Sequence, residues 1–338
     1  MRDATITLSH GGGGKAMRAL IEELFVPAFG GDAAEDQARL SLEELVWQGD
    51  RLAFTTDSFV VDPLFFPGGD IGGLAVAGTV NDLVVGGARP LYLSCGMVLE
   101  EGLPVATLRR VADSMRHMAA TANVSIVTGD TKVVERGAAD KLFINTAGIG
   151  IIPAGIALSA GNALPGDAVI VSGPLGEHGV AILVARNQLA IEADVASDCQ
   201  PLGGLVTALL AACPATRCLR DATRGGVATV LNEFARASGV GIHISERSLP
   251  IREPVRGACE ILGLDPLYLA NEGKLVAVVP GPEAERALTA MRSHPSGADA
   301  AIVGRVVCEP AGMVIMESVF GGERIVDMLV GDQLPRIC

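Results

Sequence analysis

Short apolar segments alternate with segments of helical periodicity along the whole chain, and this alternation is the strongest constraint on the fold. An apolar segment at 52–56 precedes an expected helix at 74–85. Another at 91–99 precedes an amphipathic helix expected over 105–122. The same order returns in the second half, beginning with a strand expected at 169–171. Alternation in both halves predicts an α/β protein built as two α/β sandwich domains.

The length of 338 residues is sufficient for two such domains. The stretch 142–166 carries no charge over enough residues to cross a bilayer, but it contains Pro153, Pro165 and repeated glycines. We interpret it as a buried strand followed by an interdomain linker. The expected units are an N-terminal domain, a C-terminal α/β domain and a mobile tail, at residues 1–155, 156–325 and 326–338.

Charge and cysteine content narrow the classes of partner. The net charge of −13 would repel a polyphosphate backbone, and no Lys/Arg-rich stripe offsets it, so no nucleic acid partner is expected. A nucleotide is still possible where carboxylates hold a divalent metal. Seven cysteines without CxxC spacing, together with the lack of an apolar secretory segment near the start, predict a cytoplasmic protein that is not bound to a membrane.

A short apolar strand is expected at 6–8. It leads into four glycines, 11–14, which follow His10 and precede a helical segment. Such a loop can present backbone N–H groups to a phosphate, which makes Gly12 and Gly13 candidate nucleotide contacts. The pattern departs from a P-loop, because Ser9 stands at its first glycine and Ala16 at its Ser/Thr position. A plain flexible turn is therefore the alternative.

Three aspartates are placed where a carboxylate is costly without a partner. Asp57 and Asp130 stand at the ends of expected strands, and Asp82 follows Asn81 inside an expected helix. Mg²⁺ prefers oxygen ligands, so the three aspartates predict a metal–nucleotide site. Capping or turn duty is the alternative for each. Thr131 and Lys132 follow Asp130; the lysine could contact a transferring phosphoryl oxygen or form an exposed salt bridge.

Two motifs in the second half carry further candidates. Glu272, between Asn271 and Gly273, precedes an expected strand and could be a general base or part of a turn. Asp221 and Arg224 precede a glycine-opened helix, which they could brace, or they could face phosphates. No zinc-ligand spacing is present, so no structural metal is expected.

The last residue, Cys338, is the most unusual feature. A terminal thiol is an oxidation liability, and reactivity usually explains exposed cysteines. Pro335 stiffens the preceding chain, so we expect Cys338 to be carried outward on a mobile arm, as a carrier thiol. An accidental terminal thiol is the alternative.

Taken together, these motifs resemble the HypE family of hydrogenase maturation proteins over nearly the whole chain. The family is similar to aminoimidazole ribonucleotide synthetase, selenophosphate synthetase and thiamine-monophosphate kinase, and the acidic motifs by themselves indicate only that superfamily. The terminal Pro-Arg-Ile-Cys points to HypE. The motifs are Asp57-Ser58, Gly78 to Leu83, Gly129 to Val133, Asp221 to Gly226, Asn271 to Lys274 and Pro335 to Cys338.

The resemblance implies a two-domain fold of the aminoimidazole ribonucleotide synthetase type, and a homodimer that pairs its N-terminal sheets and binds ATP between the two domains. It also implies a reaction. The carbamoyltransferase HypF loads Cys338 with a carboxamide, ATP phosphorylates the carboxamide oxygen, and loss of phosphate leaves a thiocyanate. The cyanide passes to iron on the HypC–HypD complex, for the Fe(CN)2CO centre of a [NiFe] hydrogenase.

The resemblance also assigns roles to residues. Glu272 is the expected base, Lys132 stabilises the transferring phosphoryl group, and His10 is a weaker catalytic candidate. Other activities are a selenophosphate synthetase-like enzyme, disfavoured because the loop has Lys15 and no cysteine, a small-metabolite kinase, and a non-catalytic carrier scaffold. The expected Mg²⁺ ligands are Asp57, Asp82 and Asp130, and the expected ATP contacts are Gly12, Gly13, Asp57, Asn81, Asp82, Asp130, Thr131, Asp221 and Asn271.

Overall fold

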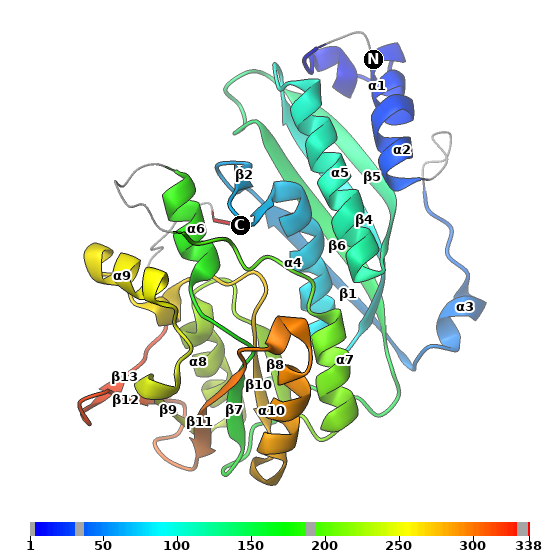
Figure 1. Ribbon diagram of the computed structural model, residues 1–338. Helices are drawn as coiled ribbons and strands as arrows, with labels where there is room; N and C mark the ends of the chain where they lie inside the picture. The colour runs from blue at the N-terminus through cyan, green and yellow to red at the C-terminus, as the bar shows by residue number, and fades with distance from the viewer. Residues whose placement is uncertain (1–3, 31–36, 187–193, 330–336) are drawn as a thin grey trace.

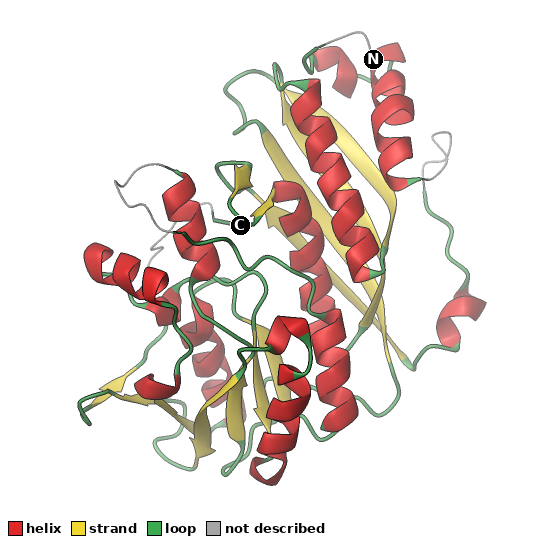
Figure 2. Ribbon diagram, in the orientation of Figure 1, coloured by secondary structure: helices red, strands yellow, loops and turns green. Residues whose placement is uncertain are grey.

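Two β-sheets, each with its own helices, make up the protein (Figures 1 and 2). The computed structural model describes residues 4–30, 37–186, 194–329 and 337–338. The chain builds the first sheet before it enters the second, and residues 153–167 connect the two. The predicted α/β class is confirmed, while the exact domain limits stay predictions.

The first sheet has four strands and is covered by helices on one face only. Its strands pair antiparallel except β4 and β5, which are parallel. Helices α4 and α5 pack against the covered face (Figure 2). Leu52 and Phe54 on the other face are 61% and 69% exposed. In sheet order the strands are β1 (Arg51–Phe59), β6 (Leu142–Ile152), β4 (Arg89–Glu100) and β5 (Ser125–Val134), and the helices are α4 (Ile71–Val85) and α5 (Val105–Ala122).

Helix α4 lies at the centre of the molecule. Asp70 caps its start by accepting hydrogen bonds from the N–H groups of Gly72 and Gly73 at 2.8 and 3.0 Å. Its side chains are apolar and small around almost the whole circumference, as expected for a helix buried on all sides. It contacts the first sheet, α5, and also β8 and α7 of the second half. This burial places Asn81 and Asp82 at the contact between the two halves.

The second sheet has seven strands with helices on both faces. Only β12 and β9 are parallel neighbours. Along β10 the side chains alternate: Ala277 and Val279 join the core shared with α7 and α10, while Val276 and Val278 join the core shared with α8. The strands in sheet order are β13 (Glu323–Ile325), β12 (Val314–Glu317), β9 (Gly241–Ser245), β11 (Ala301–Val307), β7 (Ala168–Val171), β10 (Leu275–Val279) and β8 (Cys218–Asp221), and the helices are α7 (Gly203–Ala212), α8 (Gly226–Ser238) and α10 (Ala284–Arg292).

Shorter elements complete the described part of the chain. None of its helices is both long and apolar enough to span a membrane. The remaining helices and strands are α1 (Lys15–Leu20), α2 (Val26–Phe29), α3 (Leu42–Val46), α6 (Glu177–Ala185), α9 (Glu253–Leu262), β2 (Phe65–Phe66) and β3 (Gly69–Asp70); one π-helical turn is Ile21–Phe25, and the 3₁₀ turns are Leu8–Gly11, Glu246–Ser248, Pro266–Tyr268, Gly281–Glu283 and Pro295–Gly297.

The helix predicted over 105–122 and the buried strand predicted from 142 are confirmed, but two expectations about strands were wrong. No strand forms at 6–8, where a 3₁₀ turn follows a single bridge from Thr5 to Pro104. Strands β1 and β5 do not end at their aspartates, because the backbone ladder continues past both residues and pairs Asp57 with Thr146 and Asp130 with Gly96. Both aspartates therefore lie inside strands.

Candidate active site

Three carboxylates from different elements meet where the two halves of the protein touch. Asp82 on α4 accepts a hydrogen bond from the Thr55 hydroxyl at 3.0 Å, yet burial and nearby Asp57 raise its pKa. Asp57 pairs with Arg224 at 2.9 Å. Burial, and then the charge of Asp82, raises the pKa of Asp221 on β8 to about 7. This concentration of negative charge has the character of a cation or phosphate–metal site.

Glu272 lies beside this group, in the loop that enters β10. It is 3% exposed, and its Oε1 atom has no hydrogen-bond partner among the described residues. Burial, and then Asp221, raises the pKa of this carboxyl well above the usual value. Asp198 holds the loop by accepting the N–H groups of Glu272 and Gly273 at 3.0 and 3.2 Å. Gly273 is required, since a Cβ atom there would lie 1.9 Å from the Asp198 carbonyl oxygen.

A buried ion network supports the Glu272 loop from the second domain. Lys274 pairs with Asp198 at 3.2 Å and lies 3.7 Å from Glu177, which also pairs with Arg252 at 2.8 Å. The side chains of Lys274 and Asp198 are 6% and 1% exposed. Sequence analysis missed Asp198, Glu177 and Arg252 because nothing in their local patterns indicates a partner so far away in the chain.

Asn81 and Asn271 hold the backbone of the site together. The Asn81 amide donates to the carbonyls of Gln200 and Glu272 and accepts from Leu202 N–H, at distances between 2.8 and 3.3 Å. The Asn271 amide donates to the carbonyls of Ala222 and Leu269 and accepts from Gly176 N–H. Both side chains are buried. Their polar groups hold the backbone of the protein itself, and the nucleotide contact expected of both residues stays a prediction.

The end of the chain, Ile337 and Cys338, is seated in this site. Val60 N–H donates to a main-chain oxygen of Cys338 at 3.2 Å, and His178 Nε2 lies 2.7 Å from the Ile337 carbonyl oxygen. Burial, and then Glu272, raises the pKa of the Cys338 thiol to about 12, while Arg224 beside the thiol opposes the shift. The expectation that the thiol is carried outward is therefore wrong for this structure. The rest of the expected tail from 330 to 336, with Pro335, lies outside the described residues.

A second cluster, which we call the β5 cluster, comprises His10, Gly12, Gly13, Asp130, Thr131 and Lys132. Lys132 pairs with Asp130 at 2.9 Å, and this contact is the main reason that the pKa of Asp130 is lowered. The glycine loop reaches the strand at Val133, where a Cβ atom on Gly11 would lie 2.7 Å from the Val133 nitrogen. His10 Nδ1 lies 2.9 Å from the Thr7 hydroxyl.

The β5 cluster is separate from the group that we call the interdomain cluster: Asp57, Asp82, Asp221, Arg224, Glu272 and Cys338. The row of paired residues Asp57–Thr146–Cys95–Gly129 crosses all four strands. Three strand spacings amount to about 14 Å. Within one chain the three predicted metal ligands therefore do not converge, since Asp130 stands apart. Among the described residues no group of three acidic, cysteine or histidine side chains is arranged to hold a metal.

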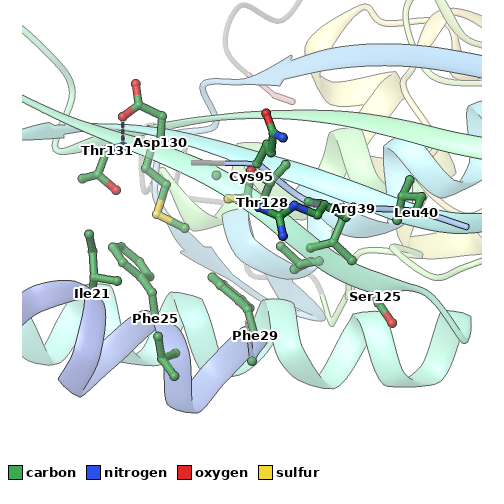
Figure 3. Close-up of a pocket in the computed structure, with 18 of the residues that line it drawn as sticks. Ile21, Phe25, Phe29, Arg39, Leu40, Cys95, Ser125, Thr128, Asp130 and Thr131 are labelled. Carbon is green, nitrogen blue, oxygen red and sulfur yellow. Dashed lines mark hydrogen bonds between the residues drawn. The ribbon is translucent and has the colours of Figure 1, made fainter. Parts of the chain in front are cut away.

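A pocket of about 780 Å³ opens next to the β5 cluster. Its walls are the helical segment from Met17 to Phe29, residues 37–40, and β4 and β5. Figure 3 shows Phe25 and Phe29 pointing from the helical segment toward the strand that carries Thr131. The volume and the mixed apolar and polar lining are typical of a small-molecule site.

Comparison with known proteins identifies the family. Residues 34–152 match the N-terminal domain, and residues 165–317 the C-terminal domain, of AIR synthase related proteins. The chain is 59% identical to the carbamoyl dehydratase HypE of Rhodobacter capsulatus, over all of this chain and 99% of that protein.

Solved structures agree with the sequence comparison. A crystal structure of the hydrogenase maturation protein HypE in complex with ATP is 50% identical, with a TM-score of 0.93 over 99% of this chain and all of that one. HypE in a HypE–HypF complex is 49% identical, with a TM-score of 0.80 over 92% of this chain and all of that one. The predicted family is thus confirmed, and the chain belongs to the HypE family of carbamoyl dehydratases.

Proposed function

We propose that this chain uses ATP to dehydrate a carboxamide carried on its own Cys338. The observation that carries the proposal is the seating of Cys338 next to Glu272 and Arg224 at the contact between the two domains. In the balanced reaction, the S-carboxamide and ATP give an S-cyano cysteine, ADP and phosphate. The carboxamide oxygen leaves with the phosphate, and both N–H protons are lost from nitrogen.

Glu272 is the proposed base. An amide N–H becomes acidic once its oxygen is phosphorylated, and a carboxylate within reach can then take the proton. The raised pKa of Glu272 brings its proton affinity closer to that of a base useful near neutral pH. Arg224 stays charged beside the sulfur and can stabilise negative charge on the carboxamide oxygen.

The nucleotide site is proposed to use both clusters. A relative binds ATP, and the pocket beside Asp130 offers apolar walls for a purine ring. Asp57 and Asp82 fit Mg²⁺, because each carboxylate lies in the field of the other and the site lacks enough positive charge to balance them. Bound there, the ion would neutralise phosphate charge. Lys132 is proposed to contact the transferring phosphoryl group, and His10, Gly12, Gly13 and Thr131 to line the phosphate path.

A second copy of the chain is proposed to unite the two clusters. In one copy Asp130 and Lys132 stand about 14 Å from Asp57. The helix-free face of the first sheet exposes Leu52 and Phe54, which is unfavourable in water. Pairing of two such faces would cover these side chains and bring the β5 cluster of one copy toward the interdomain cluster of the other.

The proposed partners follow from the relatives. HypE occurs in a solved complex with HypF, so we propose that a carbamoyltransferase of this type loads Cys338. We further propose delivery of the cyanide to a HypC–HypD complex in the cytoplasm.

Mass spectrometry tests the reaction directly. The full-length protein is carbamoylated on Cys338 and incubated with Mg²⁺ and ATP. We expect the adduct to lose the mass of one water, with one phosphate released per adduct. An adduct of unchanged mass under these conditions would refute the proposal and favour a carrier scaffold. The Cys338→Ala variant should bind ATP but release no phosphate, whereas a small-metabolite kinase would retain full turnover.

Mixing two inactive variants tests the shared site. Asp130→Ala chains and Glu272→Gln chains are each expected to be inactive as homodimers. A mixed dimer would contain one site in which both residues are intact, so random exchange should restore about a quarter of the wild-type rate. Two variants that stay inactive after proven subunit exchange would show that each site is built from one chain.

A further inference from the structure

His178 on α6 contacts the seated tail and has no part in the chemistry proposed above. The ring is buried, with 0% exposure, and meets Phe66 edge-on at 5.6 Å between ring centroids. Its Nε2 atom lies 2.7 Å from the Ile337 carbonyl oxygen, and its Nδ1 atom lies 2.8 Å from the Ser197 hydroxyl oxygen. Both ring nitrogens are therefore engaged, one by the tail and one by the protein body.

The surrounding groups select one tautomer of the ring. A carbonyl oxygen can only accept a hydrogen bond, so Nε2 must carry the hydrogen that reaches Ile337. Nδ1 then accepts from the Ser197 hydroxyl. The Ser197 hydroxyl oxygen also accepts a hydrogen bond from the Cys199 N–H at 3.1 Å, and this contact holds the Ser197 side chain in place. Burial lowers the pKa of His178 and so favours the neutral ring.

The main chain of the tail is hydrogen-bonded to residues of both domains. His178 in the second domain binds the carbonyl of Ile337, and Val60 after β1 binds a main-chain oxygen of Cys338. The Ile337 side chain packs against the apolar cluster that includes Val180 and Leu269. Contacts to the main-chain oxygens of two successive residues determine the direction of the last residue, and thus where its sulfur points.

We propose that His178 is a positioning residue that seats the tail so that the group on Cys338 meets Glu272 and Arg224. The inference rests on the proposed function, since it concerns the same tethered substrate. His178 acts through the main chain of residue 337 and takes no proton from the carboxamide. Ser197 is its support, because the hydroxyl can donate to Nδ1 and so stabilises the tautomer that carries its hydrogen on Nε2.

Alkylation of Cys338 in the unmodified full-length protein tests the seating by itself. Loss of one hydrogen bond between neutral groups should release the tail more often, and we expect His178→Phe to speed labelling of Cys338 about fivefold. His178→Gln, which keeps an amide N–H donor at a similar reach, should stay within about twofold of wild type. Exposed Cys308 is the internal reference, and its rate should not change.

Single-turnover dehydration tests the consequence for the reaction. We expect His178→Phe to slow water loss from the carbamoylated protein about fivefold or more, while the ATP concentration at half-maximal rate stays the same. His178→Gln should restore most of the rate. A general structural defect would instead change the ATP dependence as well, and Gln would not rescue it.

Equal labelling of Cys338 in wild type and His178→Phe would overturn the inference. Should His178→Phe unfold, Ser197→Ala decides: we expect about twofold faster labelling, and an unchanged rate refutes the role of the ring. Labelling needs neither ATP nor a carbamoyl group. If the wild type fails to lose water, the proposed function fails, and the labelling experiment still decides whether His178 seats the tail.

Discussion

Carboxylates in the interdomain cluster and in the β5 cluster have opposite surroundings. Glu272 is buried and Asp221 is half-buried among other acids, and the pKa values of both are raised. Asp130 lies on an open strand beside Lys132, and its pKa is lowered. Burial penalises the charged form and an adjacent cation favours it. The difference suggests that the interdomain cluster handles protons, while the β5 cluster keeps fixed charges for phosphate.

Among the variants that test the difference between the two clusters, Glu272→Gln should have the largest effect on the rate of dehydration. Without the carboxylate, we expect dehydration to slow on the order of 10³-fold, because positioned bases contribute at about this level. Glu272 must lose its proton to act as a base, so the wild-type rate should rise as the pH passes through the raised pKa of this residue. The rate of the variant should not show this rise. Single-turnover mass spectrometry across pH measures both. Glu260→Gln on α9 is the control, and an equal loss there would contradict the assignment.

Lys132→Ala should have the next largest effect. We expect dehydration to slow about 10²-fold, because the lysine is proposed to stabilise the transferring phosphoryl group. The pH dependence should keep its wild-type shape, in contrast to the Glu272 variant. Arg116→Ala on α5 removes an exposed cation that also pairs with an aspartate, at 3.6 Å, and should leave the rate unchanged. If the rise of the rate with pH moved to a different pH in Lys132→Ala, the two clusters would share one role in proton transfer.

Asn271→Ala should lower the stability of the folded protein, because Asn271 holds the backbone of the site and is not proposed to take part in the reaction. The change leaves the buried Gly176 N–H without its acceptor and the Leu269 carbonyl without its side-chain donor, so we expect the free energy of unfolding to fall by about 2 kcal/mol. Urea unfolding measures this. Asn162→Ala is the control, since its exposed amide donates to a single carbonyl, that of Ala157. If the Asn271 variant had full stability but bound ATP weakly, this result would support the nucleotide contact that the sequence predicts for Asn271.

Asp221→Asn should have the smallest effect, and it should be stabilising. The folded pKa of about 7 exceeds the usual 3.8, so between these values the folded state holds a proton that the unfolded state has lost. Stability therefore falls as pH rises through this window. The variant removes the cost, and we expect about 1 kcal/mol of added stability at pH 8 but none at pH 3. Thermal unfolding without nucleotide measures this, with Asp113→Asn as control; stabilisation that persists at pH 3 would contradict it.

Much of the fold could be predicted because local patterns dominate it. The apolar spacing in 105–122 predicted both ends of α5. The start of α4 was expected three residues late, at 74, because Gly72 and Gly73, which follow the capping Asp70, are weak helix formers. The ends of β1 and β5 were missed because ladder pairing depends on the neighbouring strands and not on side-chain polarity. The buried support of Glu272 by Asp198 joins residues 74 positions apart, which no local pattern reveals.

Periodicity and motifs that can be read along the chain were enough to predict the α/β class, the family, the residue types of the site and the terminal thiol. Their places in space depend on how the assembled protein packs. The tertiary structure separated Asp130 from Asp57, since strand order and face follow from pairing and packing. It also turned Cys338 inward, because the backbone contacts from His178 and Val60 and the apolar seat of Ile337 exist only after both domains have assembled.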